Sequence, residues 1–419
     1  MIVAKCIDLS SLELARLVHR GDTVAWGQGA AEPLELTQKL MAERHAIGPF
    51  SVFMGISYSA TPDPAFTDCV TFSSYCGTGT NQALARVGKL DILPSGYLEL
   101  AEILKKRVDV LLVQLAPADT QGRYSLGVGY DYIAHLIDTA RIVIAEVNDQ
   151  SPFTFGERMI TDADIDYVVR TSRPLLGSGP SVCKDVELAV AHNAAALIED
   201  RATIQLGLGV VPEGVLSLLS DRRDLGIHSG AIGDAVGRLM RAGVVTNAAK
   251  SIDVGTTVTG LMLGSPELYG FAHRNHAIAF RPVEYTHAPE VLAQLDRFVA
   301  INSAVEVDLT GQINAEVAGV NYVGAVGGAA SFLRGALRSR GGLPIIALPS
   351  RGRFGGSRIV ATLSGPVSTP RSDAGLIVTE FGFADLRGQS VSQRVRSMIA
   401  IAHPDFRDHL LAQGAIIAK

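Results

Sequence analysis

The sequence predicts an α/β protein made of two similar open α/β domains, each with a parallel or mixed sheet flanked by helices. Three features support this prediction: the composition, an internal repetition, and strands that are apolar along their whole length. The chain has 419 residues, of which 47% are apolar and 19% charged, and it contains 43 glycines. This is the composition of a large globular protein with buried cores and many tight turns, and the length suggests two or three domains.

The internal repetition predicts that the two domains are related. LVHRGDTVAWGQG aligns without gaps with LIEDRATIQLGLG, and each ends in a Gly-x-Gly turn. Three pairs of segments match in the same order: 17–29 with 197–209, 116–125 with 305–314, and 164–171 with 373–380. We therefore expect an N-terminal domain over 1–180 and a C-terminal domain over 181–419. The break falls in SRPLLGSGPSVC, where proline and glycine cluster.

The strands and helices follow from hydrophobic periodicity. Continuous apolar runs predict strands buried on both faces, at 108–115, 140–147, 344–350 and 375–380. Between such strands, the segment 185–200 has a helical pattern. Its predicted apolar face consists of Val186, Ala189, Val190, Ala194 and Leu197.

Three glycine-rich turns follow predicted strands, at 27–33, 207–212 and 322–332. Glycine lets a ligand approach the backbone, and a helix opening after such a turn presents free N–H groups to an anion. Pro212 suits the first position of the helix after the second turn. These turns lack the third glycine of a dinucleotide fingerprint. Each turn either binds a ligand or serves only packing, and the packing alternative is strongest for the first.

Charge, hydropathy and cysteine content exclude several functions. The net charge is −5, without a Lys/Arg cluster, so we expect no nucleic-acid partner. No apolar run reaches the roughly 18–20 residues of a membrane span, and the start lacks the pattern of a secretory signal. We expect a cytoplasmic protein with four reduced cysteines and no metal site. Cys76, beside a glycine turn, is either a buried structural thiol or a catalytic one.

Several long segments carry a resemblance to a known family. The quoted matches are GLGVVPEGVL, DLGIHSGAIGDAVGRLMRAGVVTNAAKS, YSLGVGYDY, IVIAEVN, INSAVEVDLTGQINAE, GGAASFLRGA, SRIVATL, VTEFGFADLRGQS and IAHPDFR. Over nearly its whole length the chain resembles the acetyl-CoA hydrolase/transferase family, and within it the glutamate-using 4-hydroxybutyrate CoA-transferases. The resemblance implies two class I-type domains with an acyl-CoA thioester bound at their interface. It also implies coenzyme A as part of the substrate, and a homodimer or higher homo-oligomer.

One departure from the family affects the chemistry directly. Family members use a glutamate that attacks the acyl-CoA, forms a glutamyl-CoA thioester and passes CoA to a second carboxylate. That glutamate follows a His-Ser or His-Thr pair. Here the pair is His228–Ser229 and the next residue is Gly230, while Asp234 stays in register. We expect this position to lack the usual nucleophile.

A second departure lies in the third glycine turn. The family pattern is close to GxGGQxDF, whereas this chain reads AVGGAASF, with Ala325, Ala329 and Ser331 at the changed positions. The backbone scaffold for CoA and a thioester oxyanion is thus retained while polar side chains are lost. The resemblance implies CoA-binding residues at Gly207, Leu208, Gly209, Val210, Val211, Asn302, Gly324, Gly327, Gly328 and Arg353, where Arg353 stands for a family lysine.

Several residues are candidates to act beside Gly230, each with a structural alternative. Ser229 is a helix N-cap or a nucleophile. His228 is a general base or a structural residue, as the family keeps it beside the glutamate. Asp234 is expected to cap or orient the turn. Asn302 either contacts CoA or is a turn amide bonded to its own backbone.

Two further acids, Glu306 and Asp308, match family positions without any mark of a replacement nucleophile. Three functions remain open. The first is an acyl-CoA enzyme that acts on the bound thioester without a glutamyl-CoA intermediate, by hydrolysis, direct acyl transfer or decarboxylation. The second is a conventional CoA-transferase using another carboxylate. The third is a non-catalytic CoA-binding or partner subunit.

Overall fold

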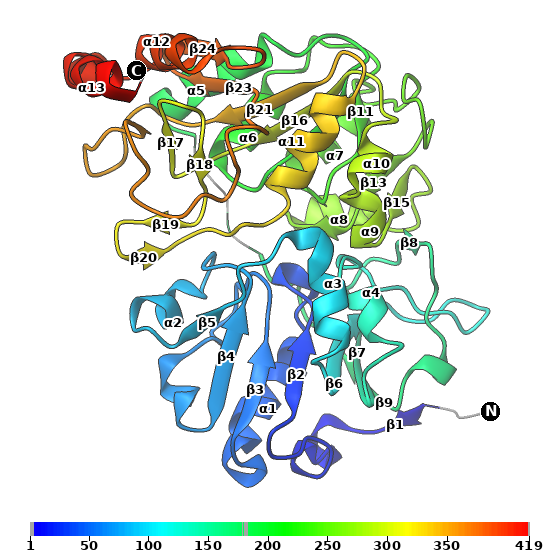
Figure 1. Ribbon diagram of the computed structural model, residues 1–419. Coiled ribbons are helices and arrows are strands. Elements are labelled where there is room, and N and C mark those ends of the chain that lie inside the picture. The colour runs from blue at the N-terminus through cyan, green and yellow to red at the C-terminus, as the bar shows by residue number, and fades with distance from the viewer. Residues whose placement is uncertain (1–3, 178, 180–182, 418–419) are drawn as a thin grey trace. The chain divides into compact units, whose positions relative to one another are not determined.

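The computed structural model describes residues 4–177, 179 and 183–417 (Figure 1). The chain divides into two units: unit 1 is Met1–Gly179 with Val258–Tyr285, and unit 2 is Pro180–Thr257 with Thr286–Lys419. The predicted boundary between 180 and 181 falls on residues outside the described ones. The prediction placed residues 258–285 in the C-terminal domain. In the structure they belong to unit 1.

Unit 1 is built on an eight-stranded sheet in which every neighbouring pair is parallel. The strand order is β1 (Lys5–Cys6), β9 (Tyr167–Thr171), β7 (Ile142–Asn148), β6 (Val110–Leu115), β2 (Thr23–Trp26), β3 (Phe50–Phe53), β4 (Val70–Ser74) and β5 (Leu90–Ile92). All six residues of β6 are buried, as expected for a strand covered on both faces.

The other elements of unit 1 connect and cover these strands. The helices are α1 (Leu34–Ile47), α2 (Gln82–Arg86), α3 (Tyr97–Lys105), α4 (Ile133–Leu136), α8 (Pro266–Ala272) and α9 (Val283–Thr286). Short 3-10 turns are η1 (Leu9–Ser11), η2 (Leu14–Arg16), η3 (Gly29–Ala31), η4 (Pro64–Asp68) and η5 (Asp162–Asp164). A small sheet contains β13 (Thr257–Thr259), β15 (Ile278–Phe280) and β8 (Phe155–Gly156), and β14 is Leu261–Met262.

Unit 2 is built on a six-stranded mixed sheet. Its order is β11 (Gly226–Ile227), β10 (Thr203–Leu206), β16 (Phe298–Asn302), β21 (Leu343–Ala347), β23 (Leu376–Thr379) and β24 (Gly382–Asp385). Only β24 runs antiparallel to its neighbour. Helix α11 packs on β16 and β21, as Figure 1 shows, and α5 packs on β21, β23 and β24.

The remaining elements of unit 2 surround this sheet. The helices are α5 (Asp185–Ala195), α6 (Val210–Ser217), α7 (Asp234–Arg241), α10 (Pro289–Leu292), α11 (Ala329–Arg338), α12 (Val391–Ala400) and α13 (Pro404–Ile417). The short strands are β12 (Ala231–Ile232), β17 (Glu306–Asp308), β18 (Ile313–Asn314), β19 (Val317–Ala318), β20 (Asn321–Tyr322) and β22 (Ile359–Val360). Within the described residues, no helix is both long and apolar enough to cross a membrane.

The strand order of the two sheets agrees with the predicted internal repetition. Five strands follow in the order β9-β7-β6-β2-β3 in unit 1 and β23-β21-β16-β10-β11 in unit 2. The first pair of matched segments carries β2 and β10, and the third pair carries β9 and β23. Each matched strand therefore holds the same place in its sheet.

The second pair of matched segments forms the same turn in both units. The Asp side chain accepts hydrogen bonds from the backbone N–H groups two and four residues further on, at 2.9 and 3.0 Å for Asp119 and 2.8 and 3.0 Å for Asp308. The glycine three residues on has a positive φ, 73° at Gly122 and 97° at Gly311. Glycine adopts this conformation without steric cost, which explains why Asp-x-x-Gly occurs in both copies.

One predicted helix buries a different face from the one that the sequence predicts. Helix α5 covers Asp185–Ala195 of the predicted segment 185–200, and Val190 and Ala194 are fully buried as expected. Val186 is 47% exposed, so its predicted place in the core is wrong. The buried face is completed by Ala191 and Ala195. The buried stripe therefore begins a turn later than the hydrophobic pattern indicated.

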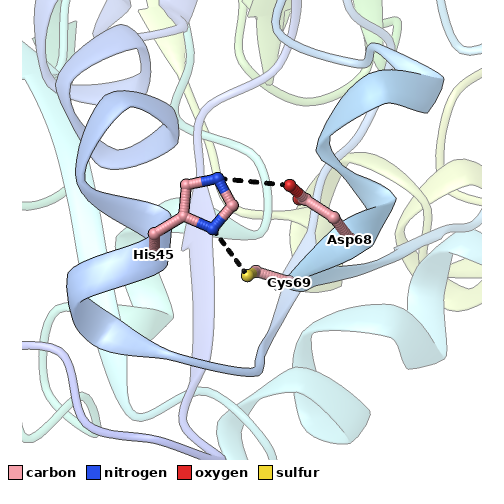
Figure 2. Close-up of side chains that lie close together, drawn as sticks. All are labelled: His45, Asp68 and Cys69. Carbon is pink, nitrogen blue, oxygen red and sulfur yellow. Dashed lines mark hydrogen bonds and ion pairs between the residues drawn. The ribbon is translucent and has the colours of Figure 1, made fainter.

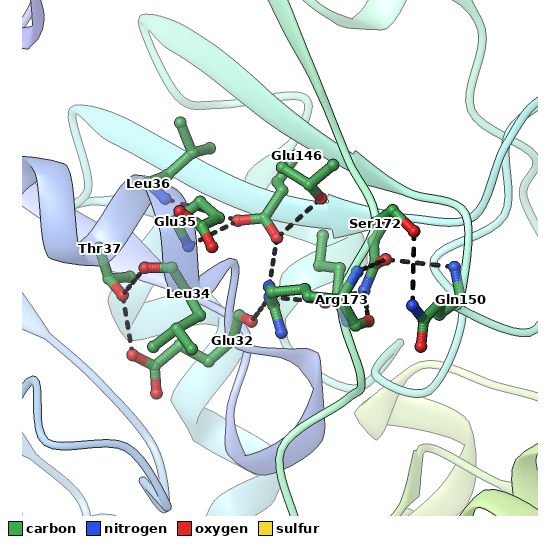
Figure 3. A network of polar contacts seen from close by, with 12 residues as sticks. Glu32, Leu34, Glu35, Leu36, Thr37, Glu146, Gln150, Ser172 and Arg173 are labelled. Atoms are coloured by element: carbon green, nitrogen blue, oxygen red, sulfur yellow. Dashed lines mark hydrogen bonds and ion pairs between the residues drawn. The ribbon is translucent and has the colours of Figure 1, made fainter. Parts of the chain in front are cut away.

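A buried ion pair ties β7 of unit 1 to the segment before α1 (Figure 3). The Arg173 Nε group lies 2.7 Å from Oε1 of Glu146, whose side chain is fully buried. The same guanidinium donates to the Glu32 carbonyl and to Gln114, each at 2.8 Å. Glu146 in turn accepts from the backbone N–H of Glu35. Burial raises the pKa of Glu146, and the charge of Arg173 acts in the opposite direction.

Candidate active site

The second glycine turn lies directly against the end of β16. A Cβ atom placed on Gly207 would lie 2.8 Å from Oδ1 of Asn302, so a larger residue here would require the Asn302 side chain to shift. Gly209 has φ +139° and is the N-cap of α6, which begins at Val210. Pro212 is thus the third helical residue, and its predicted first position is wrong. It is still tolerated in the first turn, where a backbone N–H has no partner within the helix.

Asn302 is buried, and its side chain bonds to that of Gln205. Its amide group donates to Gln205 Oε1 at 2.9 Å, and the Gln205 amide lies 3.3 Å from Asn302 Oδ1. The prediction that Asn302 bonds to its own backbone is therefore wrong. Because this pair spans β10 and β16, it fixes the ends of the two strands from which the glycine turn begins.

The segment after β11 returns to β10 instead of capping a helix. His228 and Ser229 are fully buried, and the His228 backbone N–H donates to Ile204. The Ser229 hydroxyl lies 3.2 Å from both the N–H and the carbonyl oxygen of Leu206. The alternative that Ser229 is a helix N-cap is wrong, because α7 begins at Asp234 with Gly233 as its N-cap.

The space beside Gly230 is filled by an imidazole. A Cβ atom placed on Gly230 would lie 2.6 Å from Cε1 and 2.8 Å from Nε2 of His287. Such an atom on Gly328 would lie 2.5 Å from Cδ2 and 2.6 Å from Nε2 of the same ring. Real Cβ atoms essentially never come this close to another heavy atom. A side chain at either position would therefore require the His287 ring to shift.

His287 was not singled out in the sequence. It lies between α9 and α10 and is 4% exposed, and its ring centre is 4.4 Å from that of Phe332. Its Nδ1 atom lies 2.8 Å from the Thr286 hydroxyl. Burial lowers the pKa of His287 to about 3, so the imidazole is neutral at physiological pH. In the sequence His287 simply follows Thr286 and belongs to no motif, so its place beside Gly230 and Gly328 could not be predicted.

The third glycine turn needs its glycines for backbone reasons. A Cβ atom on Gly324 would lie 2.0 Å from the carbonyl oxygen of Ala315, and Gly327 has φ +60°. Helix α11 starts at Ala329, directly after Gly328. Phe332 anchors this first turn in a cluster of buried side chains. Of the predicted residues, Gly230, Gly327 and Gly328 thus lie in one neighbourhood, and Gly207 and Asn302 form a second contact.

Comparison with known proteins identifies the family. Residues 7–175 match the acetyl-CoA hydrolase/transferase N-terminal domain, and residues 264–414 match the C-terminal domain of the same name. The chain belongs to the acetyl-CoA hydrolase/transferase family. Its fold is that of the family's solved structures.

Three relatives illustrate the similarity. The chain is 40% identical to the 4-hydroxybutyrate coenzyme A transferase of Clostridium kluyveri over 80% of this chain and 79% of that protein. It superposes on RipA from Yersinia pestis with a TM-score of 0.93 and 34% identity, covering 98% and 97% of the two chains. For the 4-hydroxybutyrate CoA-transferase of Porphyromonas gingivalis the TM-score is 0.82 and the identity 33%, with the same coverage.

The acids that match family positions are held in structural contacts. Glu306 Oε1 accepts hydrogen bonds from the Asn314 amide and from the backbone N–H groups of Ser364 and Gly365, at 3.0, 2.7 and 3.2 Å. Asp308 organises the Asp-x-x-Gly turn described above. Both are buried. Their carboxylates therefore stabilise backbone in this family member.

Glu213 is a carboxylate that the sequence reasoning passed over. It lies in the first turn of α6, after the second glycine turn. Burial raises its pKa, the charge of Arg238 lowers it, and the charge of Asp234 raises it again. Asp234, which was expected to cap or orient the turn, is the first residue of α7, and the N-cap is Gly233 instead.

Arg353 lies on a separate, exposed turn. The turn is closed by a bridge between Arg351 and Ser357, and Arg353 is exposed within it. Its charge lowers the pKa of the neighbouring Arg358, although burial is the larger cause. Arg351 and Arg353 thus lie on this turn, with Arg358 directly after it, and Arg351 is paired with Asp405.

In the first glycine turn, which lies in unit 1, the side chain of Gln28 forms hydrogen bonds to the residues around it. The Gln28 amide donates to the Tyr97 hydroxyl and to Asp131, each at 2.6 Å, and its oxygen accepts from Tyr75 and from the Ile56 backbone. Burial raises the pKa of Asp131. The packing alternative for this turn is therefore favoured.

Cys76 is a structural thiol by its surroundings. It is 1% exposed, and burial raises the pKa of its thiol, which disfavours the reactive thiolate. We expect iodoacetamide to label exposed Cys6 in the folded protein and to leave Cys76 unmodified, as measured by mass spectrometry of peptides. Equal labelling of the two thiols at early times would contradict this expectation.

A second group of reactive side chains lies on the surface of unit 1 (Figure 2). His45 Nδ1 is 3.4 Å from Cys69 Sγ, and His45 Nε2 is 3.3 Å from Asp68. One ligand atom from each residue lies within 4.8 Å of the others, a spacing a metal ion could use. In the present arrangement Arg44 engages Asp68 at 2.9 and 3.1 Å, and the two ring nitrogens face different partners. The group is thus a hydrogen-bonded chain, which the sequence spacing did not reveal.

Proposed function

We propose that this chain acts on the thioester of a bound acyl-CoA without forming a glutamyl-CoA intermediate, transferring the acyl group directly to water or another acceptor. The proposal rests on family membership together with one observation. His287 fills the place where a side chain at position 230 would begin. Glycine has no nucleophilic side chain, and a Cβ atom at position 230 would meet the His287 ring.

The residues implied by the family resemblance would hold the CoA. The turn Gly207–Val211 leads into the N-terminus of α6, whose free N–H groups suit an anion. Gly324, Gly327 and Gly328 would let the thioester approach bare backbone, and Asn302 would keep the neighbouring strand end in place. Arg353 would meet a phosphate. We further infer that the protein acts in the cytoplasm as a homodimer or higher homo-oligomer, as the resemblance implies.

The test uses a panel of acyl-CoA thioesters with and without an added carboxylate. We expect free CoA to be released without any carboxylate acceptor, and we expect no CoA adduct on the protein by mass spectrometry. Hydroxylamine and borohydride, which destroy glutamyl-CoA thioesters, should leave the activity unchanged. Release of CO2 would assign decarboxylation as the reaction. CoA binding without turnover across the panel would instead identify a non-catalytic subunit.

A second candidate is a conventional CoA-transferase that uses another carboxylate. Glu213 favours it, because its raised pKa and its place after the second glycine turn set it apart from the structural acids. In that case CoA would be found attached to Glu213, and Glu213→Gln would abolish exchange between carboxylates. The matched control is Glu199→Gln, at an exposed position of the same unit.

A further inference from the structure

The imidazole of His287 is held between two segments that carry the predicted catalytic and CoA-binding residues. The Nε2 atom of the ring lies close to both glycines. It is 2.8 Å from the position that a Cβ atom on Gly230 would take, and 2.6 Å from the corresponding position on Gly328. Phe332 packs against the ring. Both glycines are partly exposed, whereas His287 is buried. The ring thus lies just beneath the surface formed by these two turns.

The protonation state of this ring suits a hydrogen-bond donor. A neutral imidazole carries one N–H, and burial keeps this ring neutral. An N–H in a buried place interacts more strongly with a carbonyl oxygen than it would in water, because the local dielectric constant is low. A neutral imidazole is also the form in which histidine polarises a carbonyl group without giving up a proton.

We propose that His287 donates the Nε2–H hydrogen bond to the thioester carbonyl of the bound acyl-CoA, from the space left by the absent side chain at position 230. This inference rests on the proposed function, since it needs a bound thioester. As water or another acceptor attacks, a bond forms to the thioester carbon, negative charge develops on the carbonyl oxygen, and the N–H stabilises it. The carbon–sulfur bond then breaks, and CoA leaves as the thiol with the proton that the acceptor gives up. The Thr286 hydroxyl lies 2.8 Å from Nδ1, and we assign it as a positioning residue: a hydroxyl that donates to Nδ1 leaves the ring hydrogen on Nε2.

Four variants separate this role from a structural one. His287→Ala removes the donor, and we expect the rate of free-CoA release to fall about 100-fold or more, as for loss of one oxyanion donor. His287→Gln places an amide donor near Nε2 and should keep most of the activity. Thr286→Val should lower the rate, whereas Thr286→Ser keeps the hydroxyl and restores it. His192→Ala, on the exposed face of α5, serves as the control.

A spectroscopic measurement tests the hydrogen bond independently of turnover. The probe is a stable ketone analogue of acetyl-CoA in which CH2 replaces the thioester sulfur, labelled with 13C at the carbonyl. In the unaltered protein and His287→Gln, we expect its infrared carbonyl stretch to shift to lower frequency on binding. In His287→Ala most of that shift should be lost. Thermal unfolding of each variant checks that it is folded.

The outcomes distinguish this inference from the proposed function. An equal carbonyl shift in all variants would overturn the role of His287, whatever the turnover. If His287→Ala and His287→Gln both release CoA at the unaltered rate, the role is likewise overturned, while the proposed function stands. A glutamyl-CoA adduct in the unaltered protein would instead overturn the proposed function. In that case the infrared comparison still decides whether His287 meets the carbonyl.

Discussion

Gly230→Glu by itself is expected to give no exchange of CoA between carboxylates, whereas Gly230→Glu combined with His287→Ala is expected to give it. The reason is steric: a Cβ atom at position 230 falls 2.6 Å from the His287 ring. Overpacking of this kind costs about 1–3 kcal/mol of stability in the single variant. Removing the ring opens the space and allows the introduced carboxylate to act as nucleophile. Exchange is measured with two acyl-CoA and carboxylate pairs, and the adduct by mass spectrometry.

The matched control is Gly230→Gln combined with His287→Ala, which has the same size and no nucleophilic carboxylate. It should show neither exchange nor a CoA adduct. Exchange in the Gly230→Glu variant alone, with unchanged thermal stability, would mean that the ring moves aside readily. If the double variant is folded and still inactive, the changed residues Ala329 and Ser331 of the glycine loop are the next cause to test, by restoring Gln and Asp there.

Arg173→Met is expected to cause the largest loss of stability in unit 1, about 3–5 kcal/mol, because it leaves the buried Glu146 carboxylate without its cation. The Glu32 carbonyl and Gln114 also lose a donor. Replacing both partners, as Arg173→Met with Glu146→Met, should recover part of this loss, since no buried charge then remains. Denaturant unfolding followed by circular dichroism measures the difference.

The surface pair between Arg16 and Glu13 provides the control for this experiment. Both side chains are more than half exposed, at 77% and 58%. Arg16→Met should therefore change stability by less than about 1 kcal/mol. Similar losses for Arg16→Met and Arg173→Met would show that burial of the ion pair has no special effect.

Much of the fold could be predicted because it depends on local patterns. Continuous apolar runs identified β6, β7, β21 and β23, since strands covered on both faces have no polar side. A turn that needs a positive φ or a bare backbone requires glycine, so related turns keep glycine at the same spacing. The repetition of Gly-x-Gly and Asp-x-x-Gly therefore predicted two related units, and their sheets share a strand order. The glycine pattern also located the three glycine turns, and the sequence shows directly that position 230 has no side chain.

What occupies that position was decided only by the tertiary structure. His287 and Gly230 are far apart in the chain, and no periodicity relates them; they meet because β11 and the segment before α10 lie in one unit. The buried partners of Ser229 and Asn302, the exposure of Val186 and the place of segment 258–285 have the same origin. Sequence patterns report which residues prefer burial or a turn. Which buried side chains then touch depends on how the elements pack, and that packing places an imidazole beside Gly230.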